Sequence, residues 1–290
     1  NSWRVSSQKL VKGQNIITVP KIGSDASERG GSVYVRMPYS NSSSIVKIRI
    51  SGGVRIPVLD LHNVNSDSKV ELVNNYINEL SEYVSKLPEM YVGEDHSYDE
   101  RTSVLNSTEI VTNEGLFSIP ATAALKAINS GLSDHNDKIN RVLESTNAFD
   151  EMMNMFYRHK GLTEDSSDTS NKVPTGRVNI RYMRMFDGAF MYAGGLHIGV
   201  GFDSTLGLLV GKAFDNPSFN GYFGWGISHE IGHQINQGKL AYAEVTNNVF
   251  SLLAQTANDT SKSRLELSNI YPKIYEKVTS GYVLAITSRL

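Results

Sequence analysis

Hydrophobic and polar positions near the start of the chain follow the pattern of β-strands. Segments rich in β-branched residues, some of them alternating with polar ones, lie between clusters of Gly, Ser, Asn and Asp. These predicted strands span residues 15–20, 32–37, 45–50 and 55–61. Their short connectors favour antiparallel hairpins, and Pro57 fits best at a sheet edge or a strand start. We therefore expect a β-rich, sandwich-like module over residues 1–64.

The spacing then changes to that of helices, with apolar residues three and four positions apart. Helices are predicted over residues 67–87, 121–128, 134–156 and 242–256, and strands over 104–105, 110–111 and within 177–200. Residues 164–175 are polar and predict a loop. The fold class that follows is α+β, with the β-rich amino-terminal module followed by a second domain over residues 65–290. The boundary falls between residues 62 and 67.

Composition narrows the possible functions. The 290 residues carry a formal net charge of -2, so no basic surface for nucleic acid is expected. The longest apolar runs, at 189–196 and 206–210, are far shorter than the roughly 20 residues of a membrane span, so no membrane span is expected. The chain has no cysteine, which excludes thiolate chemistry and disulfides. Any bound metal must therefore be held by nitrogen and oxygen.

His229, Glu230 and His233 form an H-E-x-x-H motif. Residues four apart on a helix share one face, so both imidazoles can reach one ion. Glu230 lies beside them and can act as the general base, taking the proton from a metal-bound water as that water attacks a peptide carbonyl. In a chain of this composition the motif arises by chance on the order of once per hundred sequences.

The surroundings of the motif favour a real site. Ile227, Ile231 and Ile235 form an apolar stripe that can bury the helix, and Gly238 is a helix stop signal. Trp225 lies one turn before the first histidine and is equally compatible with stacking on a sugar or with filling the core.

A third ligand is needed, and Glu244 is the next carboxylate downstream. The metzincin alternative would require Gly at position 236 and His at 239, where the chain has Asn236 and Lys239. Glu244 opens the predicted helix over 242–256, and a helix–turn–helix of this length can return it to the histidines. Two histidines, one glutamate and a water would form an open tetrahedral Zn²⁺ site.

Neighbours of Glu244 extend this prediction. Asn247 or Asn248, one turn further on, could hydrogen-bond a metal ligand from outside the coordination sphere. Apolar positions of the same helix are expected to face a core; they are Val245, Val249, Leu252 and Leu253.

Two long segments resemble the enhancin-like, mucin-degrading metallopeptidases, which are gluzincins. They are GWGISHEIGHQINQ at 224–237 and YAEVTNNVFSLLAQ at 242–255. Further likeness lies in KGQNIITVP at 12–20, VLNSTEIV at 104–111, SIPA at 118–121 and MYAGGLHIGVG at 191–201, so the resemblance covers most of the chain. It implies that His229, His233 and Glu244 are the zinc ligands and Glu230 the base. It also implies a secreted or cell-surface enzyme that cleaves O-glycosylated, mucin-like proteins.

Other residues keep two interpretations open. Gly194 and Gly195 either let substrate approach a strand closely or form a bulge or tight turn. His197 is interpreted as structural. Gluzincins usually carry a Tyr or His that stabilises the oxyanion, and Tyr271, Tyr275 and Tyr282 are equally compatible with packing. Because only 46 residues (290 − 244) follow Glu244, we expect a catalytic domain that is truncated at its C-terminus.

Two rival functions remain beside the zinc endopeptidase. One is a glycan-binding module that keeps a peptidase fold without catalysis; the presence of Glu230 argues against it, because a module without chemistry would be free to lose the base. The other is a zinc peptidase for peptides without glycans.

Overall fold

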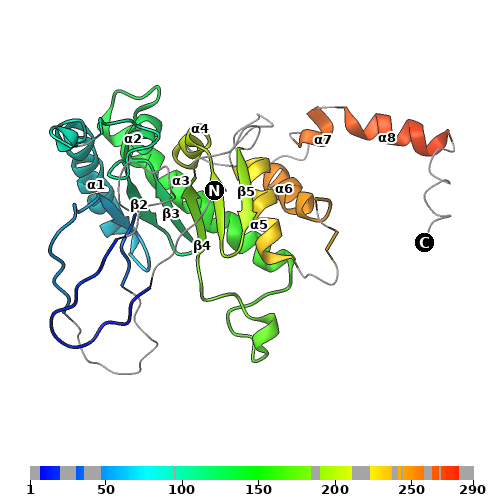
Figure 1. Ribbon diagram of the computed structural model, residues 1–290. Helices are drawn as coiled ribbons and strands as arrows, with labels where there is room; N and C mark the ends of the chain where they lie inside the picture. Colours follow the sequence, from blue (N-terminus) through cyan, green and yellow to red (C-terminus); the bar gives the residue numbers. More distant parts are fainter. Residues whose placement is uncertain are drawn as a thin grey trace.

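A six-stranded sheet forms the centre of the computed structural model (Figure 1). The structure describes residues 7–19, 31–35, 47–94, 96–183, 190–210, 223–236, 241–242, 244–257, 263–267 and 269–280. The strand order is β1-β2-β3-β4-β6-β5. The strands are β1 (Val58–Asp60), β2 (Thr108–Val111), β3 (Gly115–Ile119), β4 (Val178–Tyr182), β5 (Met191–Gly194) and β6 (His197–Val200). Pairs β2–β3 and β5–β6 are antiparallel, and the other neighbouring pairs are parallel. Strands β1 and β5 stand at the two ends of this order and are the edge strands.

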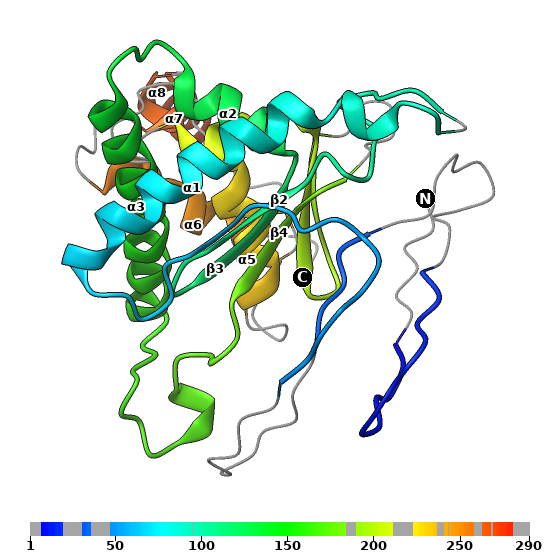
Figure 2. The same ribbon diagram turned by 90° about the vertical axis from the view of Figure 1, so that its left-hand side faces the viewer.

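Helices lie beside the sheet, with α1, α2 and α3 packed against one another on one of its faces (Figures 1 and 2). The α-helices are α1 (Ser66–Lys86), α2 (Ala121–Asn129), α3 (His135–His159), α4 (Phe202–Thr205), α5 (Ser228–Ile235), α6 (Asn247–Thr256), α7 (Arg264–Leu267) and α8 (Ile270–Thr279). Short 3-10 turns are η1 (Glu89–Tyr91), η2 (Thr169–Asn171) and η3 (Leu206–Leu209), and η5 (Phe223–Ile227) is a π-helix. Asn65 caps α1 and Asp134 caps α3 by accepting backbone N–H groups.

Helix α3 connects the sheet with the pair α5 and α6. Its Phe149 packs edge-on against Phe117 of β3, with ring centroids 4.9 Å apart. About two turns later, Phe156 meets Phe250 of α6 in the same manner, at 5.2 Å. All four rings are buried. The α5–α6 pair is therefore fixed to the sheet through one continuous apolar core.

The predicted amino-terminal β-module is not shown. Within residues 7–19, 31–35 and 47–57 no strand forms, and the remaining residues of the three earliest predicted strands lie outside the described part. The segment 55–61 does contain β1, which pairs with β2 and thus belongs to the main sheet. Pro57 precedes this edge strand, as predicted, and its carbonyl accepts hydrogen bonds from Glu109 and Thr108. The division of the chain at residue 64 stays a prediction.

Most other predicted elements are observed, apart from one predicted strand and the start of the helix predicted at 242–256, which begins only at Asn247. The helices predicted at 67–87, 121–128 and 134–156 correspond to α1, α2 and α3 within three residues at each end. The strand predicted at 104–105 is wrong, because these residues form a turn. Two apolar neighbours without flanking alternation carry too little information to distinguish a strand from a turn.

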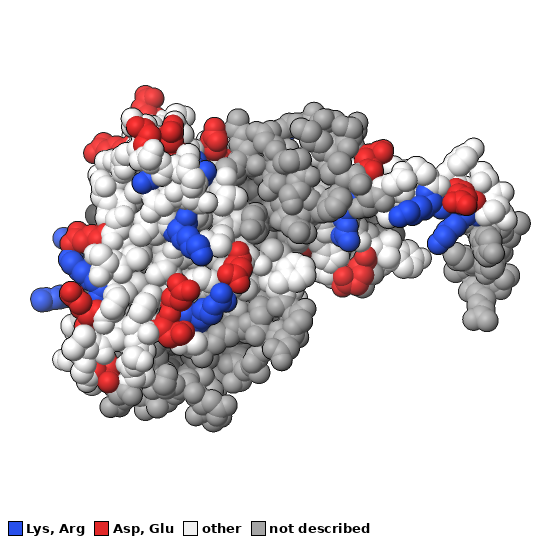
Figure 3. Space-filling view, turned by 90° about the horizontal axis from the view of Figure 1, so that it is seen from above, with Lys and Arg blue, Asp and Glu red and all other residues white. Residues whose placement is uncertain are grey.

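Charged side chains of both signs are interspersed over the described surface seen in Figure 3. The view agrees with the small net charge of -2 and shows no extended basic region among the described residues on this face. None of the described helices is both long and apolar enough to span a bilayer.

Candidate metal centre

Helix α5 carries the H-E-x-x-H motif on a partly buried face. Ile227 and Ile231 are fully buried and fix the helix against the core, as the apolar stripe predicted. The rings of His229 and His233 lie side by side, with centroids 5.0 Å apart, as expected for residues four apart on a helix. The helix ends at Ile235, and the stop predicted at Gly238 lies outside the described residues.

A glycine lets α6 approach α5 closely. A Cβ atom at Gly232 would lie 2.9 Å from the Cα atom of Asn247 and 3.1 Å from the ring of Phe250. Only a residue without a side chain fits at this crossing without displacing backbone. Gly232 thereby sets the distance at which the segment before α6 passes the two histidines.

Glu244 lies in the turn before α6 rather than in the helix, which begins at Asn247. The prediction that Glu244 opens a helix is therefore wrong. Its φ of 63° lies in the left-handed region, which is incompatible with a regular α-helix. Holding a residue with a side chain in this conformation costs about 1 kcal/mol or more. This backbone turns the carboxylate toward the histidines: Oε2 lies 2.9 Å from Nε2 of His229, and Oε1 lies 3.2 Å from Nε2 of His233.

Donor atoms of His229, His233 and Glu244 all lie within 4.8 Å of one another. Among the described residues this is the one group of such side chains that could hold a metal ion. The side chains differ in exposure, at 15% for His229, 28% for His233 and 71% for Glu244. A ligand could therefore reach the group from the side of Glu244.

Asn248 holds the first histidine in orientation. Its side-chain oxygen lies 2.9 Å from Nδ1 of His229 and accepts a hydrogen bond from Nδ1–H, which directs Nε2 toward Glu244. The amide nitrogen of Asn248 donates to the backbone carbonyl of Glu244 at 2.8 Å. Among the described residues no hydrogen bond joins the Asn247 side chain to the ligands; Asn247 is buried, and its side-chain oxygen accepts a hydrogen bond from Asn236.

Glu230 lies partly buried between α5 and the edge strand β5. Burial raises the pKa of its carboxyl group above the usual range. The neighbouring His229 and His233 lower this pKa in part, as does a hydrogen bond from the backbone N–H of Ala193, whereas Glu244 raises it. Sequence reasoning missed Ala193, because a backbone donor supplied by a distant strand leaves no residue-type signal.

Trp225 lies in the π-helix η5, directly before α5. Its side chain is half-buried, and the guanidinium of Arg264 in α7 lies 4.9 Å from the ring centroid. Its backbone carbonyl accepts a hydrogen bond from the Ser251 hydroxyl at 2.9 Å. A π-helical turn beside a candidate site is a common feature of functional helices.

Gly194 and Gly195 lie at a tight turn, which is one of the two interpretations that the sequence allowed. Gly194 pairs with His197, and between them Gly195 and Leu196 form the β5–β6 hairpin turn, in which Gly195 has a φ of +58°. His197 lies on the sheet with Nε2 3.2 Å from the Tyr192 hydroxyl, and burial lowers the pKa of its ring. These contacts support the structural interpretation of His197.

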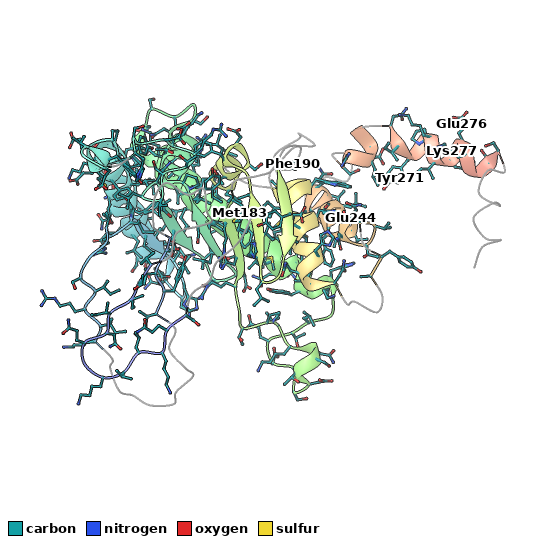
Figure 4. The ribbon with its side chains drawn as sticks, in the orientation of Figure 1. Met183, Phe190, Glu244, Tyr271, Glu276 and Lys277 are labelled. Atoms are coloured by element: carbon teal, nitrogen blue, oxygen red, sulfur yellow. The ribbon has the colours of Figure 1, made fainter. Side chains whose placement is uncertain are left out.

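The two described tyrosines that were considered for oxyanion stabilisation, Tyr271 and Tyr275, lie far from the donor group. Tyr271 and Tyr275 belong to α8, which projects away from the sheet (Figures 1 and 4). Figure 4 shows Tyr271 and Glu276 on this arm, well separated from Glu244. Tyr282 lies outside the described residues.

The buried face of α6 differs in part from the predicted one. Phe250 and Ala254 face the core, and Leu253 packs partly buried against it, as predicted. Val249, however, is exposed at 42%, and Val245, in the turn before the helix, at 65%. The rotation has a physical cause: the helix starts later than predicted and packs at Gly232, which places Phe250 against α3.

Together, a mixed sheet, an adjoining H-E-x-x-H helix and a carboxylate facing both imidazoles have the arrangement of a metallopeptidase. Residues 107–277 match the family described as peptidase M60, enhancin and enhancin-like. This match covers more than half of the chain, and the chain belongs to that family. No curated protein matches the chain.

Solved structures with the same fold include catalytic domains of this family. The ZmpB metallopeptidase from Clostridium perfringens is 25% identical with a TM-score of 0.56, covering 77% of this chain and 37% of that one. The M60 catalytic domain of Clostridium perfringens ZmpC, in complex with the sialyl T antigen, is 24% identical with a TM-score of 0.55, covering 77% and 36%. A functionally unknown conserved protein from Bacillus anthracis is 18% identical with a TM-score of 0.51, covering 77% and 37%. The chain thus spans little more than a third of these proteins.

Proposed function

We propose that this chain is a zinc-dependent endopeptidase that hydrolyses peptide bonds of O-glycosylated, mucin-like proteins, secreted or at a cell surface. The observation that carries the proposal is the convergence of donor atoms from His229, His233 and Glu244 within 4.8 Å, next to Glu230. Family membership supports a peptidase, and the sialyl T antigen bound to the ZmpC domain supports a glycosylated substrate.

The donor set fits zinc. Two imidazole nitrogens and one carboxylate, in a chain without cysteine, match an open catalytic zinc site with one position left for water or substrate. The hydrogen bond from His229 Nδ1–H to Asn248 leaves Nε2 as the ligand atom. When bound, zinc would lower the pKa of water and polarise the scissile carbonyl.

Each remaining residue has a separate role in the proposal. Glu230 takes the proton from the attacking water and passes it to the leaving amine. The Ala193 N–H holds the Glu230 carboxylate at the edge of the sheet. An extended substrate would lie along the edge strand β5, where one side of the strand has no partner strand among the described residues.

Trp225 completes the proposal by stacking on a sugar. Its ring lies one turn before the first ligand, so a stacked sugar would hold the adjacent peptide bond near the metal. In the same proposal Gly194 and Gly195 let the substrate pass close to the end of β5.

Paired substrates test this function. An O-glycosylated mucin fragment and the same polypeptide after deglycosylation are incubated with the chain, with and without chelator. We expect cleavage of the glycosylated form alone, its loss with chelator and its recovery with zinc. Equal cleavage of both forms would contradict the mucin-type substrate, and glycan binding without metal-dependent cleavage would contradict the peptidase.

A further inference from the structure

Helix α6 holds the side chains of Trp225 and Arg264 beside each other, although the two residues are distant in sequence. The Ser251 hydroxyl donates to the backbone carbonyl of Trp225 at 2.9 Å. One turn further on, the side-chain oxygen of Gln255 accepts the backbone N–H of Arg264 at 2.8 Å. Ser251 and Gln255 are both buried, so these anchors are sheltered from water. The Arg264 guanidinium is thereby held 4.9 Å from the centroid of the Trp225 ring.

The chain contains a second stacked arginine that serves as a comparison. The Arg101 guanidinium lies 4.6 Å from the Phe202 ring and also forms an ion pair with Asp203 at 3.3 Å. Arg264 is exposed and stacks in the same way, yet no ion pair joins it to a carboxylate within the described ranges. A planar guanidinium fixed on an aromatic ring, with its hydrogen-bond donors available, is suited to binding an anion.

Helix α6, which anchors Trp225 and Arg264, also carries a residue of the candidate metal centre. Asn248, which orients His229, lies on the same face of α6 as Ser251 and Gln255. Gln255 lies seven positions after Asn248 (255 − 248), which is about 10 Å along the helix axis. The backbone of Arg264, anchored at Gln255, is therefore attached to α6 one turn further from Asn248 than the backbone of Trp225, which is anchored at Ser251. The outer part of a short glycan would extend in this direction beyond a sugar stacked on the indole.

We propose that Trp225 and Arg264 form a subsite for an acidic sugar, in which Arg264 determines specificity by pairing with the sugar's anionic group. A carboxylate, as in sialic acid, and a sulfate ester share the chemistry that Arg264 would recognise. This inference rests on the proposed function, since it names the glycan that the peptidase prefers.

Glycopeptides with one sequence and three glycans test the subsite: a neutral disaccharide, its sialylated form and its sulfated form. We expect the parent to cleave an acidic form with a kcat/KM roughly tenfold above that of the neutral form. Arg264→Gln should remove most of this preference, while Arg264→Lys should retain part of it. Arg101→Gln, the matched control, removes the other stacked arginine and should leave the preference in place.

Binding to the Glu230→Gln variant, measured by titration calorimetry with the same glycopeptides, decides the inference even without cleavage. A preference for the sialylated form assigns the carboxylate, and a preference for the sulfated form assigns the sulfate. Equal binding of neutral and acidic forms, or a preference that persists in the Arg264→Gln, Glu230→Gln double variant, would overturn the subsite. Failure to cleave any glycopeptide would overturn the proposed function while the titration still tests the subsite.

Discussion

The two sides of the candidate metal centre are built differently. His229 and His233 project from a regular helix whose Ile227 and Ile231 are fully buried. Glu244 instead comes from a turn with a left-handed backbone, and its side chain is 71% exposed. Helix periodicity alone sets the spacing of the histidines, whereas the position of the glutamate depends on how α6 packs on α5. The first side should therefore tolerate mutation of its surroundings better than the second.

The largest effect is expected for the base, which belongs to the regular side. Glu230→Gln should lower kcat by about 10²- to 10⁴-fold, because the amide cannot accept the proton. Zinc content and melting temperature should stay near those of the parent, since the ligands are unchanged. Glycopeptide cleavage and metal analysis of the same preparation check this, and a variant with half of the parental rate would exclude Glu230 as the base.

On the irregular side, Glu244→Ala should weaken zinc affinity more than about 100-fold by removing a ligand. The exposed side chain makes little contribution to the core, so the fold should persist. Competition with a zinc-binding dye measures the affinity, and Glu266→Ala in α7 is the control that should match the parent. Unchanged affinity in Glu244→Ala would mean that Glu244 is not the third ligand.

Asn248 links the two sides, so its replacement should affect both. Asn248→Ala should weaken zinc affinity by about 10- to 100-fold, because His229 loses the hydrogen bond that orients its ring and Glu244 loses a backbone partner. The neighbouring Val249→Ala, at a 42% exposed position, should have no comparable effect. Equal affinities for the two variants would mean that the hydrogen bond does not support the site.

The smallest effect is expected at the crossing of the two helices. Gly232→Ala places a methyl group 2.9 Å from the Asn247 backbone and should lower the free energy of unfolding by about 1–3 kcal/mol. Gly176→Ala, where a Cβ atom meets nothing within 4 Å, should change it by less than about 0.5 kcal/mol. Denaturant titration compares the two. A neutral Gly232→Ala would show that α6 can shift without cost.

Local pattern was sufficient for the histidine side of the site. The four-residue spacing of His229 and His233, and the apolar stripe at Ile227 and Ile231, are properties of a single helix. The existence of α1, α2 and α3 followed from the same periodicity. Glu244 was identified by its position in the sequence, but its left-handed backbone was not predicted, because it results from packing between α5 and α6.

Contacts between distant segments account for what the sequence did not predict. Trp225 and Arg264 are 39 positions apart (264 − 225) and meet because both are anchored to α6. The Ala193 donor to Glu230 depends on β5 lying at the sheet edge beside α5. Neither contact has a periodic or compositional signature in the chain.

The metal content of the purified chain tests the central claim most directly. Protein prepared without added metal is analysed for zinc beside the Glu230→Gln and Glu244→Ala variants. We expect a single zinc ion per chain in the parent and in Glu230→Gln, and little zinc in Glu244→Ala. Background zinc in the parent, with no binding after zinc is added, would contradict the proposed centre.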